Sequence, residues 1–104
     1  MYMFDAPKGG HMDVQEWRIQ MWTKEGEPWA TLTINNPDAD PKKGIFLVKD
    51  YSENMGVFAW LRDKGFVRET LNVSPCGDGN MILCKLDVNK IKKWGREEEK
   101  EISR

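Results

Sequence analysis

Apolar and polar residues alternate along the first third of the chain, with the period of two that is typical of β-strands. Residues 13–23 therefore predict one strand with a single buried face, formed by the apolar side chains of Trp17, Ile19 and Met21. Residues 29–35 predict a second strand. The glycine and proline within residues 24–28 predict the hairpin loop that joins the two strands.

The middle of the chain shows two further patterns. A continuous apolar run at residues 45–48 predicts a strand that is covered on both faces. The wide apolar face that begins at Val57 and ends at about Lys64 predicts a helix. Gly65 is expected at the left-handed position that follows this helix, with Phe66 as the hydrophobic contact behind it.

The C-terminal third predicts a second hairpin and a second helix. Apolar residues share one parity over residues 67–73 and again over 82–88, and residues 75–80 have the composition of the turn between them. A basic helix is expected to begin near Asp87 or Asn89. The resulting order, ββ-β-α-ββ-α, lacks the βαβ alternation of a doubly wound sheet. We therefore expect an α+β fold with a single antiparallel sheet, one helix packed on a face and a C-terminal helix.

The length of 104 residues is that of one domain, which buries roughly two-thirds of its unfolded surface. Residues 1–12 lack periodicity, so we expect a flexible leader, and its Gly-His-Met end is also typical of an expression-vector scar. The folded domain is expected over residues 13–96, and a charged, fraying tail over 97–104. No apolar run reaches the length of a membrane span, so no membrane partner is expected.

Charge and cysteine content narrow the functional classes. Sixteen Lys and Arg residues against 17 Asp and Glu residues lack the basic excess of a dedicated nucleic-acid binder. In the predicted hairpin, Cys84 lies opposite about Asn72. Asn72 is four residues from Cys76 along the partner strand, which at about 3.3 Å per residue is roughly 13 Å. This separation exceeds the reach of a disulfide. We therefore expect two free thiols and a reducing, cytoplasmic location.

The chain offers little for catalysis or metal binding. His11 is the only histidine and lies in the expected leader, so Ser-His-Asp and Cys-His arrangements lack a base. Residues 36–40 imitate the start of a calcium loop, but Pro41 and Leu47 stand where that loop needs Gly and Glu. No CxxC pair is present for zinc. We expect no enzyme activity, no metal and no cofactor.

The junction between the covered strand and the first helix is the most informative candidate site. Backbone N–H groups and the positive end of a helix dipole meet solvent at such junctions. Two interpretations stay open: these side chains cap the helix, or they form a binding surface. The residues are Asp50, Tyr51, Ser52, Glu53 and Asn54.

A second set of candidates combines aromatic and basic side chains. It consists of Trp22, Trp29, Trp94, Lys90, Lys92 and Lys93. Three interpretations fit these residues. The aromatic rings stack on bases beside the basic side chains, they anchor a protein interface, or they are partly buried at sheet edges and under the last helix.

Part of the chain resembles a known family. The residues that carry the resemblance are Glu-Pro-Trp-Ala-Thr-Leu-Thr-Ile-Asn at 27–35, Pro37-Asp38, Val-Lys-Asp-Tyr-Ser-Glu-Asn-x-Gly at 48–56, Leu61, and Gly-Phe-Val at 65–67. Over about residues 13–70 they resemble small domains of unknown function from gut bacteria and their phages, plasmids and conjugative elements. Asn36, where an aliphatic residue is expected, and the 76–84 hairpin depart from that pattern, so the C-terminal third lies outside the resemblance.

The resemblance implies a genomic setting rather than an activity. By analogy, a compact non-enzymatic chain in that setting often binds and blocks a host protein. Our principal hypothesis is a small binding protein of phage or mobile-element origin that acts on a host protein, such as a counter-defence, anti-CRISPR-like inhibitor. The second is a small-molecule or nucleotide binder with residues 50–54 at the rim of its pocket. The third, disfavoured by the net charge, is nucleic-acid binding through residues 85–96.

Overall fold

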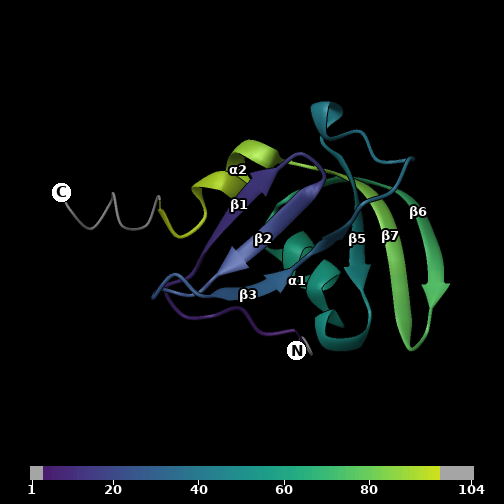
Figure 1. Cartoon of the computed structure of the whole chain (residues 1–104). Coiled ribbons are helices and arrows are strands. Elements are labelled where there is room, and N and C mark those ends of the chain that lie inside the picture. Colours follow the sequence, from purple (N-terminus) through teal and green to yellow (C-terminus); the bar gives the residue numbers. More distant parts are fainter. Residues whose placement is uncertain (1–3, 97–104) are drawn as a thin grey trace.

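A computed structural model describes residues 4–96 and arranges them in two small antiparallel sheets with two helices (Figure 1). The α+β class is confirmed, but two sheets stand where the sequence predicted one. Sheet A has the strand order β1 (His11–Gln15), β2 (Arg18–Trp22), β3 (Pro28–Thr31). Sheet B has the order β4 (Thr33–Ile34), β5 (Ile45–Asp50), β7 (Gly79–Leu86), β6 (Val67–Cys76).

Leu32 connects the two sheets. Its N–H donates to the carbonyl of Ile19 in β2 at 2.9 Å, whereas its carbonyl accepts from the N–H of Lys49 in β5 at 2.8 Å. The hydroxyl of Thr33 then accepts a 2.9 Å hydrogen bond from the N–H of Ile19. Leu32 and Thr33 are both buried, so the alternation predicted along residues 29–35 is interrupted here. The predicted single strand is therefore two strands, and the chain passes between the sheets at this point.

The single strand predicted over residues 13–23 is also wrong, because this region forms the β1–β2 hairpin. Met12 pairs with Met21 across the hairpin, and both side chains are fully buried. The turn contains Glu16, whose φ of 53° lies in the left-handed region. No glycine marks this turn in the sequence. The remaining signal is that the apolar positions change from even to odd numbers across it.

The N-terminal segment belongs to the fold from Phe4 onward, in contrast to the flexible leader expected over residues 1–12. Phe4 is buried, and its ring centroid lies 5.8 Å from that of Trp60. Because β1 already pairs with β2 at His11, the boundary expected between residues 12 and 13 falls inside a strand. The fraying tail expected over residues 97–104 lies outside the described residues.

Helix α1 (Val57–Asp63) packs against β5 and ends as the sequence predicted. The N–H of Gly65, which has a φ of 80°, donates to the carbonyl of Arg62 at 3.0 Å. The N–H of buried Phe66 donates to the carbonyl of Leu61, also at 3.0 Å. These two bonds satisfy carbonyls that the last turn leaves free.

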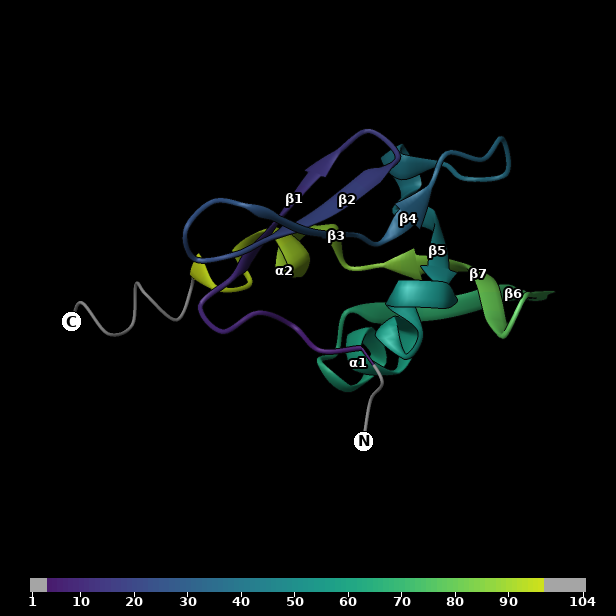
Figure 2. The same ribbon diagram turned by 60° about the horizontal axis from the view of Figure 1, so that its bottom comes forward.

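Helix α2 (Val88–Lys93) begins after Asp87, as predicted, and packs against β1. The Asp87 carboxylate accepts a 3.1 Å hydrogen bond from the N–H of Lys90, and this cap holds the pKa of Asp87 below its usual range. Figure 2 shows α1 under sheet B and α2 beside sheet A. Neither helix within residues 4–96 combines the length and apolar character needed to cross a bilayer.

The core is formed by apolar side chains from both sheets and both helices. One cluster connects β1 and β2 with β5, β7, α1 and α2, and burial of apolar surface in it provides the main driving force for folding. Its members include Phe4, Met12, Ile19, Met21, Leu32, Phe46, Val48, Val57, Trp60, Leu61, Phe66, Ile82, Cys84, Leu86 and Ile91.

The β6–β7 hairpin turns at residues 77–78, within the predicted turn. Cys84 pairs with Thr70 rather than with Asn72, because the turn has two residues instead of three and a bulge in β6 shifts the register by one more residue. Cys76 and Cys84 are both free, as expected. β6 forms one edge of sheet B, and most of its side chains are exposed.

Candidate binding groove

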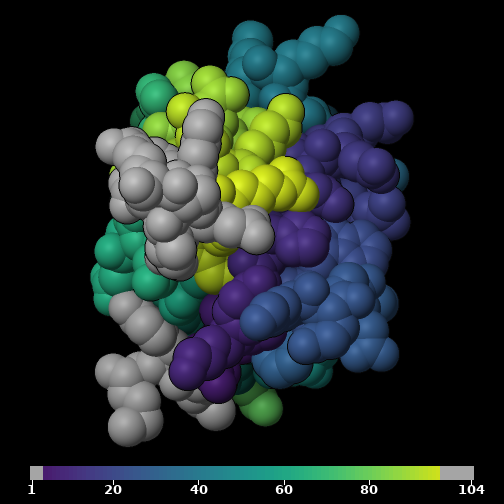
Figure 3. Space-filling view, turned by 90° about the vertical axis from the view of Figure 1, so that its left-hand side faces the viewer, coloured from purple at the N-terminus to yellow at the C-terminus, as the bar shows by residue number. Residues whose placement is uncertain are grey.

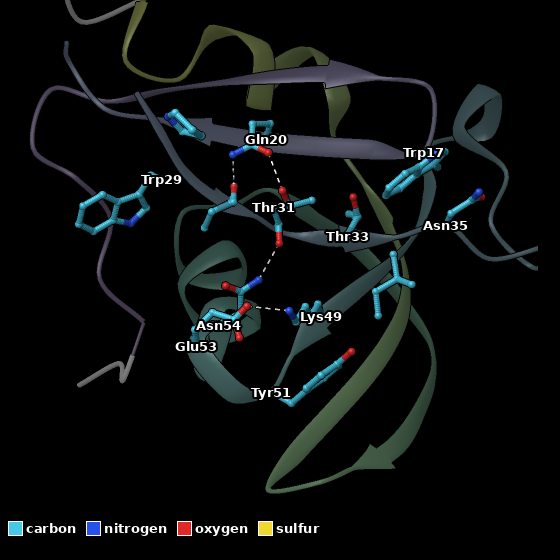
Figure 4. A pocket seen from close by; sticks show the side chains of 13 residues that line it. Trp17, Gln20, Trp29, Thr31, Thr33, Asn35, Lys49, Tyr51, Glu53 and Asn54 are labelled. Atoms are coloured by element: carbon cyan, nitrogen blue, oxygen red, sulfur yellow. Dashed lines mark hydrogen bonds and ion pairs between the residues drawn. The ribbon is translucent and has the colours of Figure 1, made fainter. Parts of the chain in front are cut away.

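An open groove with a volume of about 530 Å³ lies where the polar face of sheet A meets the end of β5 and the short 3₁₀ helix η2 (Ser52–Asn54). Figure 4 shows Trp29 and Trp17 on opposite sides, with Thr31 and Asn54 between them. Aromatic walls and a polar floor are thus combined in one hollow. The lining includes Trp17, Gln20, Trp29, Thr31, Tyr51 and Asn54.

The floor of the groove is an internally bonded polar layer. Gln20 and Thr31 face each other across β2 and β3. The Thr31 hydroxyl donates to Gln20 Oε1 at 2.5 Å, and Gln20 Nε2 donates to the carbonyl of Ala30 at 3.0 Å. Because these side chains satisfy each other, the floor is held in a fixed arrangement.

Asn54 attaches η2 to this floor. Its side chain is almost completely buried, with 1% of the residue exposed. Asn54 Nδ2 donates a 2.8 Å hydrogen bond to the carbonyl of Thr31. A buried amide needs such a partner, since an unpaired polar group in the interior is costly. This bond fixes the wall that carries residues 51–53 relative to the floor.

The rim carries an exposed ion pair. Lys49 Nζ lies 2.7 Å from Glu53 Oε2 and 5.4 Å from the ring centroid of Tyr51. The hydrogen bond from Lys49 is the main reason why the pKa of Glu53 falls to about 2, and the same bond raises the pKa of Lys49. Both groups are therefore charged at neutral pH. The rim offers a partner one positive and one negative group side by side.

The structure divides the candidate residues at 50–54 between the two interpretations. The Asp50 carboxylate accepts a 2.6 Å hydrogen bond from the N–H of Gly56, so it closes the turn before α1. Helix α1 itself begins at Val57, and the preceding Gly56 provides no side-chain cap. Ser52 is exposed, with a φ of 55°, and does not line the groove. The remaining three residues line it: Tyr51, Glu53 and Asn54.

The other predicted aromatic candidates lie away from this groove. Trp94 packs edge-to-face on Trp60, with ring centroids 5.3 Å apart, and so extends the core. Trp22 is half-buried and lines a separate hollow of about 270 Å³ on the β1–β2 hairpin. Its indole Nε1 is the one buried side-chain polar atom within residues 4–96 that lacks a hydrogen-bond partner. Of the three candidate tryptophans, only Trp29 lines the same groove as the segment at 50–54.

The three candidate lysines are on α2, outside the groove. Lys90, Lys92 and Lys93 are exposed, and Lys90 Nζ lies 3.4 Å from the carbonyl of Gly65. Figure 3 shows α2, in yellow, next to the purple N-terminal segment and β1. The structure therefore does not bring the basic residues together with Trp29.

Several groove residues escaped the sequence reasoning. Gln20 and Thr31 lie inside two predicted strands and Lys49 follows the predicted strand at residues 45–48, but none of the three was a candidate site residue. The register of the β2–β3 hairpin is the signal that would have placed Gln20 beside Thr31. A scan of protein-family models and searches of curated proteins and solved structures give no match to this chain. The groove is therefore interpreted from its own geometry.

Proposed function

We propose that this protein is a non-enzymatic binding protein that holds a segment of a partner protein in the aromatic groove. Trp29 is the observation that carries this proposal. Its side chain lines the groove and is 48% exposed, while its indole N–H donates to the carbonyl of Asp5 at 2.9 Å. A large aromatic side chain that is already fixed loses little conformational entropy on binding, and tryptophan is enriched among the residues that dominate interface energies.

The shape of the groove favours a protein segment over an enclosed small molecule. Pockets for small ligands bury roughly 70–90% of the ligand surface, whereas this groove is open to solvent. Its floor is satisfied internally, and its rim carries the Lys49–Glu53 pair. A peptide main chain with mixed side chains provides both the apolar contacts for Trp29 and Tyr51 and polar groups for that rim.

The resemblance to small domains of mobile elements supports a host protein as this partner. We extend the proposal to a phage or mobile-element protein that blocks its target in the host cytoplasm, as a counter-defence inhibitor does. Two free thiols, Cys76 and Cys84, fit a reducing compartment.

Affinity capture with matched variants tests the groove. Tagged wild-type protein, Trp29→Ala, Tyr51→Ala and Asn89→Ala are incubated with lysate of a gut bacterium, and bound proteins are quantified by mass spectrometry. Asn89 is the control, because it is an exposed residue on α2, outside the groove. We expect one protein to be retained by the wild type and by Asn89→Ala. Removal of Trp29 should weaken its purified complex by about 30-fold, the factor that corresponds to a loss of about 2 kcal/mol.

Circular dichroism of each variant separates loss of binding from loss of folding. Equal retention by all four proteins, or no protein above background, would overturn the proposal. Stabilisation of the chain by a nucleotide, abolished by Trp29→Ala, would instead assign the groove to a small ligand.

A further inference from the structure

A second surface lies on β6, at the edge of sheet B. β6 is ten residues long, and its only neighbour in the sheet is β7. Leu71 and Val73 are two residues apart, so the sequence predicted that they share one face of the strand. On β6 they are 43% and 52% exposed. An edge strand presents unpaired N–H and C=O groups, and exposed apolar side chains on it favour pairing with another strand.

The sequence of β6 is self-complementary about Asn72. Residues 70–74 read Thr-Leu-Asn-Val-Ser. On each side of Asn72 the first residue is aliphatic and the second carries a hydroxyl. When two copies run antiparallel about a two-fold axis at Asn72, Leu71 of one lies opposite Val73 of the other. Thr70 then lies opposite Ser74, and Asn72 opposite itself. Each of these cross-strand pairs matches side chains of the same chemical type.

Charge and backbone chemistry select this register over its neighbours. With the axis at Asn72, no charged residue of β6 lies opposite a like charge. An axis at Leu71 would place Glu69 opposite Val73. An axis at Val73 would place Leu71 opposite Pro75, which has no N–H to donate. The axis at Asn72 therefore pairs the two exposed aliphatic side chains with each other and leaves Glu69 opposite Pro75, at the end of the paired segment.

We infer that β6 is a self-association surface, at which two copies of this chain pair antiparallel about Asn72 and join their B sheets into one. Leu71 is the extra residue of the bulge between Thr70 and Asn72, a second register shift lies between Val67 and Glu69, and Pro75 has no N–H. Only a short part of the edge is therefore regular, so the contact is small and the dimer weak. β6 contributes no residue to the aromatic groove. The dimer therefore presents two grooves and increases avidity for a multivalent partner.

Sedimentation velocity over a wide range of protein concentration tests the association. We expect the weight-average sedimentation coefficient of the wild type to rise with concentration. Leu71→Lys/Val73→Lys should stay monomeric, because it places four ammonium groups at the paired edge. Trp29→Ala is the matched control, since it removes an equally exposed apolar side chain elsewhere and should associate like the wild type. A wild type that stays monomeric at every concentration would overturn the inference.

Cysteine cross-linking tests the register. In a Cys76→Ser background, Asn72→Cys places two thiols directly opposite each other, with Cβ atoms about 4.5–5.5 Å apart, close to disulfide geometry. Ser74→Cys is the control, because its partner across the axis is Thr70. We expect mild oxidation to convert Asn72→Cys to covalent dimer at least tenfold faster than Ser74→Cys. Equal rates would show random collision or another register and would refute the axis at Asn72.

Discussion

The side-chain amide of Asn54 and the backbone carbonyl of Thr31 form a 2.8 Å hydrogen bond that attaches η2 to β3. Because Asn54 is only 1% exposed, its loss leaves the carbonyl without a ready replacement. We expect Asn54→Ala to lower the free energy of unfolding by about 1–3 kcal/mol, measured by urea denaturation. Asn89→Ala, at an exposed position on α2, should change it by no more than about 0.5 kcal/mol. Equal midpoints for the two variants would contradict this role.

The close approach of β7 to Asp50 makes Gly79 sensitive to substitution. A Cβ at Gly79 would overlap the carbonyl oxygen of Asp50, whereas one at Gly77 meets no neighbouring atom. Gly77 has a φ of 56°, so Gly77→Ala should cost about 1–2 kcal/mol through the left-handed conformation alone. We expect Gly79→Ala to cost more, because the backbone that supports the groove wall must shift. Thermal unfolding of both variants decides this, and a larger loss for Gly77→Ala would be the contrary result.

The titration of Glu53 reports on the rim of the groove. The hydrogen bond from Lys49 lowers the pKa of Glu53 to about 2 from an ordinary value of 4.5. Between these pH values the unfolded state binds the proton more readily, so this pair stabilises the fold above pH 4.5 and its contribution is lost as pH falls toward 2. The carboxyl ¹³C shift of Glu53 should give a midpoint near the lower value. In Lys49→Met the midpoint should return toward 4.5, and an unchanged midpoint would remove Lys49 as the cause.

The buried thiol of Cys84 introduces a pH dependence at the alkaline end. Burial raises the pKa of Cys84 to about 12 from an ordinary value of 9.0. In this window the folded state keeps a proton that the unfolded state has released, so the free energy of unfolding should decrease as pH rises. Denaturation across this range should show a smaller pH slope in Cys84→Ala. Ile82→Val is the control, because it shortens a buried side chain of β7 without removing a thiol, and it should keep the wild-type slope.

Local signals account for the parts of the fold that the sequence predicted. Gly65 followed by Phe66 marks the end of α1, and Asp87 marks the start of α2, because each acts through backbone groups a few residues away. The apolar run at residues 45–48 begins β5, and its last three residues are the buried part of that strand. In contrast, the turn at Glu16 lacks a glycine that would mark it in the sequence. The passage of the chain from sheet A to sheet B at Leu32 depends on β2 and β5, two strands that are distant in sequence.

The groove was predictable only in part. The strand–helix junction pointed to residues 50–54, and Trp29 was one of the aromatic candidates. Trp17 in the β1–β2 turn and Gln20 in β2 line the groove only because sheet A meets the end of β5. Partial burial of Trp94 under the last helix was one of the open interpretations. The sequence could not select it, because its contact with Trp60 requires α2 and α1 to approach each other in three dimensions.

Leu32 has a consequence for how the molecule unfolds. Its N–H bonds to sheet A and its carbonyl to sheet B, so neither sheet separates from the other without breaking a bond at this residue. We expect a single cooperative transition rather than stepwise loss of the two sheets. In native-state hydrogen exchange, the amides of Leu32 and Lys49 should open only with the free energy of global unfolding. Leu32 thus connects the backbones of two sheets that already share one apolar core, and the sheets are expected to unfold as a single cooperative unit.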